Sequence, residues 1–120
     1  MILFSPAKIN LGLQIVRKRN DGFHDLQSVM YPVGLKDIIE IREVEGDKNA
    51  LRFSQSGLTV NEKPGGNLCE KAHALFSSIR MMPALEIHLH KQIPIGAGLG
   101  GGSSNASYIL KGLNHFTSRP

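Results

Sequence analysis

The sequence predicts an α+β domain with helices packed on one face of a mixed sheet, and three observations support this. Apolar and polar residues alternate over several segments of the first half, which is typical of strands. Two later segments carry apolar residues at helical spacing. A further alternating segment separates them, so strands are followed by helix, strand, loop and helix. A chain of 120 residues suffices for one domain and is too short for two of ordinary size.

The first clear strand is predicted over residues 8–16, where the alternation is regular. Its apolar face is formed by Ile9, Leu11, Leu13 and Ile15. Its polar face places Lys8 and Asn10 side by side, and we expect the strand to be half buried. A charged turn follows over 17–22.

The remaining elements follow from the same patterns. Strands are predicted over 24–33, 38–44 and 84–90, with shorter extended pieces near 50–54 and 57–61. Asn67 is a natural N-cap for the first helix because Glu70 stands at the third helical position. The apolar stripe of that helix is Leu68, Ala72, Leu75, Phe76 and Ile79. The second helix has the stripe Ala106, Ile109, Leu110 and Leu113, which we expect a small sheet to cover only in part.

A glycine-rich loop lies between the last predicted strand and the last helix. Five of the seven residues over 96–102 are glycines, so the backbone N–H groups can close around an anion. The following helix adds unpaired N–H groups and the positive end of its dipole. Two serines and an asparagine over 103–105 can bind phosphate or cap the helix. The segment therefore predicts a nucleotide phosphate loop.

Three alternative roles for this loop fit less well. A Walker A loop needs lysine after its last glycine, and here Ser103 and Ser104 follow Gly102. A dinucleotide-binding loop needs an acidic residue about 20 positions later, and neither Asp nor Glu occurs after Glu86. A flexible linker is not usually bracketed by a regular strand and a regular helix.

Composition narrows the class of protein. With 41% apolar and 20% charged residues, the chain is typical of globular proteins. The net charge of +4 suits an anionic small molecule as well as nucleic acid, but lysine and arginine form no dense run. The single cysteine, Cys69, fits a reducing compartment and packing within a helix. Because no apolar stretch approaches the length of a membrane span, we expect a cytoplasmic protein.

Phosphoryl transfer also needs charge neutralisation and a base. Lys8 is the candidate for neutralisation, although periodicity alone favours an ordinary surface lysine. Lys91 lies just before the loop, where it either steers phosphate or is simply exposed. Phe23 and His24 suit the stacking of a planar base, but a core phenylalanine beside a turn histidine fits them as well. The available carboxylates Asp21, Asp25 and Asp37 look solvated, so no base is evident.

A possible metal site is less well supported. His88 and His90 point to the same side of one predicted strand, but no third ligand is identifiable. We therefore favour a solvated strand face and assign no metal ligand.

Several segments together resemble one family. The loop over 94–106 resembles the phosphate motif of the superfamily of galactokinase, homoserine kinase, mevalonate kinase and phosphomevalonate kinase (GHMP kinases). Residues 5–11 and 19–28 narrow the resemblance to its branch acting on 4-diphosphocytidyl-2-C-methyl-D-erythritol. The resemblance implies ATP-dependent phosphorylation of that small molecule in the non-mevalonate route to isoprenoid precursors. Mg²⁺ is expected from the chemistry of phosphoryl transfer. It also implies the GHMP N-terminal domain over 1–120, with a fold like that of the second domain of ribosomal protein S5.

The resemblance also implies roles for residues of this chain. Lys8 would lie at the catalytic centre and Asn10 near the acceptor, while Phe23 and His24 would recognise the cytosine. Asn67 and Lys91 would lie near the adenine or its phosphates. The ATP phosphates would contact Pro94, Gly96, Ala97, Gly98, Leu99, Gly100, Gly101, Gly102, Ser103 and Ser104. The family usually has tyrosine at the position of Phe23, so stacking survives here but a hydrogen bond from the hydroxyl does not.

Several alternatives stay open. In the family the catalytic aspartate and a C-terminal domain come after the glycine-loop helix, so we expect this chain to be a truncated, inactive part of a kinase. A homoserine or mevalonate kinase is disfavoured by Phe23 and His24, which suit a nucleobase better. A nucleic-acid-binding module shares the implied fold but would need interleaved aromatic and basic residues. We expect ATP and the small-molecule acceptor as partners, with neither nucleic acid nor membrane, and the oligomeric state is open.

Overall fold

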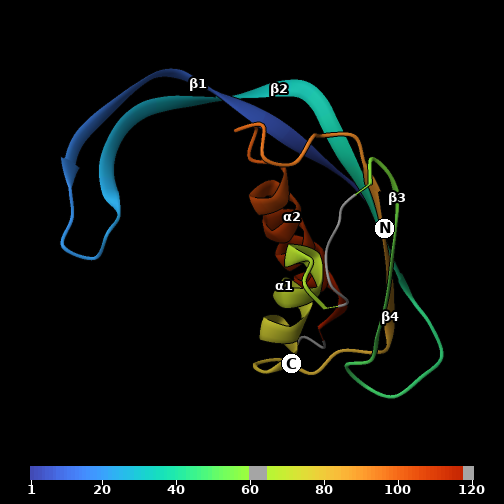
Figure 1. Ribbon diagram of the computed structural model, residues 1–120. Helices are drawn as coiled ribbons and strands as arrows, with labels where there is room; N and C mark the ends of the chain where they lie inside the picture. The colour runs from blue at the N-terminus through green and yellow to red at the C-terminus, as the bar shows by residue number, and fades with distance from the viewer. Residues whose placement is uncertain (60–64, 118–120) are drawn as a thin grey trace.

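Four strands form one mixed sheet, and two helices lie together on one of its faces (Figure 1). The computed structural model describes residues 1–59 and 65–117. In chain order the elements are β1 (Ile2–Lys18), β2 (His24–Glu43), β3 (Leu51–Gly57), α1 (Leu68–Ser77), β4 (Leu85–Lys91) and α2 (Gly101–Phe116). The strand order is β1-β2-β4-β3, in which only β3 and β4 are parallel. The predicted α+β class is confirmed.

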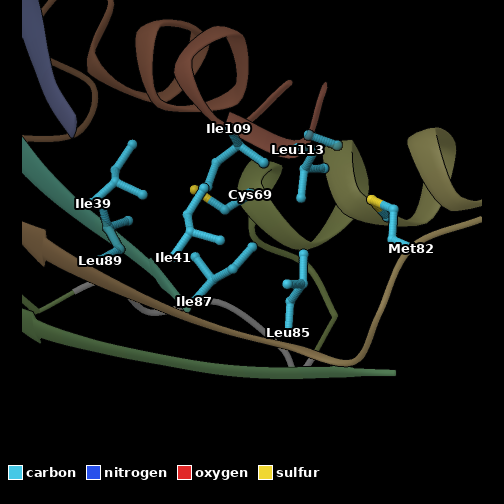
Figure 2. Close-up of a cluster of buried hydrophobic side chains, with 10 residues drawn as sticks. Ile39, Ile41, Cys69, Met82, Leu85, Ile87, Leu89, Ile109 and Leu113 are labelled. Atoms are coloured by element: carbon cyan, nitrogen blue, oxygen red, sulfur yellow. The ribbon is translucent and has the colours of Figure 1, made fainter. Parts of the chain in front are cut away.

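The core lies between the two central strands and the two helices (Figure 2). The sheet contributes alternate residues of β2 and β4, and the helices contribute one face each. The side chains of this core cluster that are fully buried are Ile39, Ile41, Leu85, Ile87, Cys69, Ile109 and Leu113. Cys69 is thus a packing residue, as its place in the helical pattern indicated.

Two of the predicted strand boundaries are wrong. The segments 24–33 and 38–44 are parts of one strand, β2, which pairs with β1 both before and after Gly34. β1 also begins at Ile2, well before the predicted start, and it tolerates Pro6 because β1 is an edge strand. β3 covers the extended piece predicted near 50–54, whereas the piece near 57–61 lies partly outside the described residues.

The outer halves of β1 and β2 form a two-stranded ribbon that projects beyond the rest of the sheet (Figure 1). The prediction of a half-buried strand over 8–16 is therefore wrong. Its four apolar side chains, Ile9, Leu11, Leu13 and Ile15, are 38% to 63% exposed in the described chain.

These four side chains do not share one face either. Leu11 lies opposite Val29, but Leu13 lies opposite Ser28, so β1 advances two residues while β2 advances one. The extra residue is Gly12, whose φ of 73° suits the glycine of a β-bulge. Because neighbouring residues of β2 point to opposite faces, the bulge moves Leu13 to the other side of the ribbon.

α1 begins where the sequence predicted, but it buries a different face. Asn67 accepts a hydrogen bond from the N–H of Cys69, and Glu70 accepts one from the N–H of Asn67, which confirms the capping box. The buried residues are Cys69, Ala72 and His73, while the predicted Leu68, Leu75 and Ile79 are exposed. The two stripes overlap at Ala72 and at the partly buried Phe76, which packs against the core. Contact with α2 and β3 selects the stripe that contains His73.

α2 packs against α1, β1 and β2. Ile109 and Leu113 are fully buried by these contacts, and Leu110 stands at the margin. The expectation that this stripe lacks a full partner is therefore wrong for its central residues. In the described part of the chain, neither helix is long and apolar enough to cross a membrane.

The buried His73 predicts a pH-dependent stability. Its side chain is 3% exposed, its Nε2 has no partner among the described residues, and burial lowers its pKa below 6.5. There is therefore a pH range in which the imidazole of His73 is protonated in the unfolded chain but neutral in the folded chain. The stabilisation is complete above pH 6.5 and is lost as the pH falls below that value. Between about pH 7.5 and about pH 5.5, we expect the free energy of unfolding measured with urea to fall less in His73→Leu than in the wild type.

A matched control is His115→Leu, since His115 is exposed near the end of α2. That variant should keep the wild-type pH dependence. An unchanged pH dependence in His73→Leu would contradict the role given to burial.

Candidate functional site

The N-terminus of α2 is open, in contrast to that of α1. Its N-cap is Gly100, which offers no side-chain hydrogen bond, and the first turn contains no acidic residue. The first intrahelical bond runs from the N–H of Ser104 to the oxygen of Gly100, so the N–H groups of 101–103 have no partner within the helix. Of the two roles open to residues 103–105, capping is excluded, because these residues lie inside α2. An uncapped N-terminus of this kind favours an anion.

The loop before α2 supplies more donors of the same kind. Gly96, Gly98 and Gly100 have φ values of 72°, 73° and 68°, and they alternate with Ala97 and Leu99, which do not have positive φ. Alternation between left-handed and ordinary backbone turns successive N–H groups toward a common centre. The loop and the helix N-terminus therefore form one continuous group of donors.

Lys8 fixes the orientation of two peptide groups in this loop. Its backbone N–H donates to the oxygen of Leu99 and its Nζ donates to the oxygen of Gly98, both at 2.9 Å. In a trans peptide the N–H points away from the preceding C=O, and the described chain has no cis peptide. The N–H groups of Leu99 and Gly100 therefore point away from Lys8. Its Nζ also lies 2.7 Å from Oδ1 of Asn10, so the predicted proximity of these two side chains is confirmed.

A cavity of about 240 Å³ lies against these donors. It is lined by Asn67, Leu68, Leu89, Lys91, Pro94, Ile95, Gly96, Gly98, Leu99, Gly100, Gly101, Gly102, Ser103 and Asn105. Ala97 and Ser104 do not line it, and the hydroxyl of Ser104 instead accepts a hydrogen bond from Ser5 at 2.8 Å. Because ligand pockets usually measure about 300–1,000 Å³, this cavity is smaller than one that encloses a whole ligand of drug size.

A buried ion pair lies beneath the loop. Nζ of Lys91 is 2.5 Å from Oδ2 of Asp37 and 3.1 Å from Oδ1 of Asn105, and all three side chains are buried. Burial opposes ionisation of Asp37, but hydrogen bonds from Lys91, from two backbone N–H groups and from Asn105 outweigh it and lower its pKa. The ammonium of Lys91 is therefore paired in this structure.

The expectation that Asp37 is solvated is wrong. Its side chain is fully buried, and it shares the inward face of β2 with Ile39 and Ile41. A signal for this was present in the sequence, because Asp37 stands two residues before Ile39 in an alternating segment. A carboxylate on an apolar face needs a buried partner, and the sequence alone did not identify Lys91 as that partner.

The predicted acceptor residues divide into two groups. Asn10 lies beside Lys8 and donates to the hydroxyl of Ser28 at 2.8 Å. Phe23 and His24 instead lie at the tip of the ribbon, where Phe23 is 72% exposed. His24 pairs with Lys18, and ten residues of strand between Lys8 and Lys18 correspond to roughly 33 Å along the ribbon. The structure thus does not bring Phe23 and His24 next to the glycine loop.

The two histidines of β4 are hydrogen-bonded to serines of β3. His88 lies within 2.8 Å of Ser54 and Ser56, and His90 lies 2.9 Å from Ser56. Both alternate with the buried residues of β4, so they lie on the face of the sheet opposite the helices. Among the described residues there is no group of three or more His, Cys, Asp or Glu able to hold a metal ion.

A family model and two relatives that are similar to this chain all describe kinases. A family described as the GHMP kinases N terminal domain matches residues 67–120. The chain is 51% identical over 118 residues to a 4-diphosphocytidyl-2-C-methyl-D-erythritol kinase of Bacteroides thetaiotaomicron, covering 97% of this chain and 43% of that protein. It is 48% identical over 120 residues to the kinase of the same name from Porphyromonas gingivalis, covering 100% of this chain and 43% of that protein.

A solved structure agrees with these relatives. The crystal structure of a 4-(cytidine 5'-diphospho)-2C-methyl-D-erythritol kinase superimposes with a TM-score of 0.81 at 34% identity. The match covers 98% of this chain and 41% of that one. The chain thus spans about two fifths of the length of the relatives it matches, and the rest of their length has no counterpart in these 120 residues. The fold of the chain is that of the N-terminal domain of the GHMP kinases.

Proposed function

We propose that residues 1–120 are the ATP-binding domain of a kinase. The kinase would transfer a phosphate from ATP to a hydroxyl of 4-diphosphocytidyl-2-C-methyl-D-erythritol, a step toward isoprenoid precursors by the non-mevalonate route. The observation that carries the proposal is the uncapped N-terminus of α2, which continues the converging N–H groups of the glycine loop. Relatives of that name at 43% to 51% identity support the choice of acceptor over homoserine or mevalonate.

The nucleotide half of the site is proposed as follows. The phosphate chain of ATP contacts the cavity-lining backbone of the loop and the first turn of α2, from Pro94 to Ser103. Ala97 and Ser104, which do not line the cavity, shape this segment rather than contact the phosphates. Asn67 and the exposed side chain of Leu68 also line the cavity, where they suit the base and its ribose. Lys91 lies beneath the loop, where its ammonium is paired with Asp37, and it supports the site from that position.

The acceptor half is proposed along the ribbon. Lys8 is assigned the neutralisation of charge at the transferred phosphate: it does not line the cavity, but its Nζ bridges the oxygen of Gly98 in the loop and Asn10 on the acceptor side. Asn10 binds near the acceptor hydroxyl, and Phe23 and His24 bind the cytosine at the far end of the ribbon. An extended nucleoside diphosphate derivative suits residues that are spread along one strand pair.

Two parts of the chemistry are not supplied by the described cavity. Its lining contains no carboxylate, whereas Mg²⁺ is usually held by one or two carboxylates together with the substrate phosphates. The described residues therefore do not by themselves form a magnesium site, and Mg²⁺ would be carried by the phosphates of ATP. For the same reason the lining offers no general base, and we place the catalytic aspartate outside these residues.

The test is a calorimetric titration of the 120-residue chain with ATP and Mg²⁺, followed by an assay for phosphorylated acceptor. We expect binding of ATP without turnover, because the donors are present and a base is not. Tripolyphosphate should compete with ATP, since the proposed contacts are to phosphate. A parallel titration with CMP distinguishes a cytidine-containing acceptor from homoserine or mevalonate.

The matched control is Ser56→Ala, which alters the opposite face of the sheet and should leave the affinity for ATP unchanged. Absence of ATP binding by the folded chain would refute the proposed site. Turnover at the rate of a complete kinase would refute the placement of the base.

A further inference from the structure

Both ends of the glycine loop are fastened to the same buried carboxylate. Oδ1 of Asp37 accepts hydrogen bonds from the N–H groups of Gln92 and Ile93, at 2.7 and 2.8 Å, directly before the loop. Oδ2 accepts one from Nδ2 of Asn105, at 2.9 Å, in α2 directly after the loop. A single side chain of β2 thus joins the two ends of the segment that carries the anion donors.

The hydrogen bonds of this carboxylate occupy both of its oxygens. Nζ of Lys91 is the fourth donor, and it also donates to Asn105, so the ion pair and the loop attachment are one network. The hydroxyl of Ser5 in β1 accepts a further hydrogen bond from Asn105 at 3.1 Å. The network therefore ties α2 to three strands of the sheet at the level of the loop.

A fixed distance between the ends of a short loop limits the conformations that the loop adopts. A loop that is already ordered loses less conformational entropy when it binds a ligand, so its affinity is higher. The donors of the glycine loop are backbone N–H groups, whose directions depend entirely on that conformation. The hydrogen bonds to Asp37 therefore determine the affinity for the ligand through the conformation of the loop, without contact between Asp37 and the ligand.

We propose that Asp37 is a positioning residue of the anion site, which holds Gln92, Ile93 and Asn105 together so that the loop donors converge before the ligand arrives. This inference rests on the proposed function, because the ligand is taken to be the phosphate chain of ATP. Lys91 neutralises the carboxylate, which would otherwise place an unpaired negative charge beneath a site for anions. Lys91 then acts on the site through Asp37 rather than as a free ammonium.

The test cuts one attachment and leaves the ion pair in place. Asn105→Leu keeps the number and branching of the side-chain heavy atoms but removes the hydrogen bonds that join α2 to Asp37, Lys91 and Ser5. Lys91 and the two backbone donors still pair with Asp37. The matched control is Ile109→Ala, one turn later on the same buried face, which lowers stability without touching the network. Circular dichroism identifies a temperature at which all variants are folded.

Two measurements are made at that temperature. The first is amide hydrogen exchange without ligand at Gln92, Ile93 and Ser104, whose N–H groups are hydrogen-bonded at the two ends of the loop. It should become faster in Asn105→Leu and stay as in the wild type in Ile109→Ala. The second is the Kd for ATP and for tripolyphosphate, which should rise about tenfold in Asn105→Leu and stay within about twofold in Ile109→Ala. Asp37→Asn should show the larger change of the two network variants, and Asn105→Leu carries the test if Asp37→Asn does not fold.

Each outcome has one meaning. A folded Asn105→Leu with wild-type exchange and wild-type Kd overturns the positioning role. Equal effects in Asn105→Leu and Ile109→Ala also overturn it, because the effect would then come from lost stability alone. If the wild-type chain binds no ATP while loop exchange still responds to Asn105→Leu, the proposed function fails and the attachment of the loop to Asp37 stands.

Discussion

Gly101→Ala is expected to lower both the stability of the chain and its affinity for ATP. A Cβ at this position would lie 2.8 Å from Nζ of Lys91 and 2.8 Å from Cγ2 of Ile93. Neither neighbour has room to move, since Lys91 is held by Asp37 and Ile93 is fully buried. Overpacking of this kind typically costs about 1–3 kcal/mol. Because Gly101 carries one of the unpaired N–H groups, we also expect a loss of affinity on the order of tenfold to a hundredfold.

Gly102→Ala is the matched control for stability. Its Cβ would meet only Cδ1 of Leu68 at 3.1 Å, and that side chain is exposed and free to turn away. We expect thermal unfolding of Gly102→Ala to stay within about 0.5 kcal/mol of the wild type. If Gly101→Ala and Gly102→Ala have the same free energy of unfolding, the close contacts beneath Gly101 do not destabilise its alanine variant.

The parts of the fold that the sequence predicted correctly depend on local chemistry. The cap at Asn67 and Glu70 forms within three residues, so its residue types alone are sufficient. The glycine loop was recognisable because five glycines in seven residues have few other uses. Lys8 and Asn10 are two positions apart on a strand, so their proximity follows from the geometry of any strand.

The parts that the sequence did not predict depend on distant partners. Whether Asp37 is solvated or buried is decided by Lys91, 54 residues later, and by Asn105, 68 residues later. The buried face of α1 is decided by contact with α2 and β3, because its two candidate stripes overlap. A single bulge at Gly12 divides an apparently regular apolar face, and alternation in the sequence does not reveal it.

Gly57→Ala is expected to have the largest effect on stability. A Cβ here would lie 2.2 Å from the backbone oxygen of Lys91 and 3.0 Å from its carbon and nitrogen. The clash is with the backbone of a central strand, so no rotation of a side chain relieves it. The φ of Gly57 is also +84°, which adds about 1–2 kcal/mol for a residue with a Cβ. We expect a total loss of more than about 4 kcal/mol, measured by urea unfolding, which is most of the stability of a marginal domain.

Gly22→Ala separates the cost of backbone strain from the cost of the clash in Gly57→Ala. Gly22 has a similar φ of +88°, but no atom lies within 4 Å of the position that a Cβ would take, so only the backbone strain applies. We expect Gly22→Ala to lose about 1–2 kcal/mol, and the difference between the variants measures the clash. A difference near zero would contradict the close approach of β3 to β4. Because Lys91 carries both the clashing oxygen and the ammonium that pairs with Asp37, any folded Gly57→Ala should also bind ATP more weakly, which links the end of β3 to the anion site.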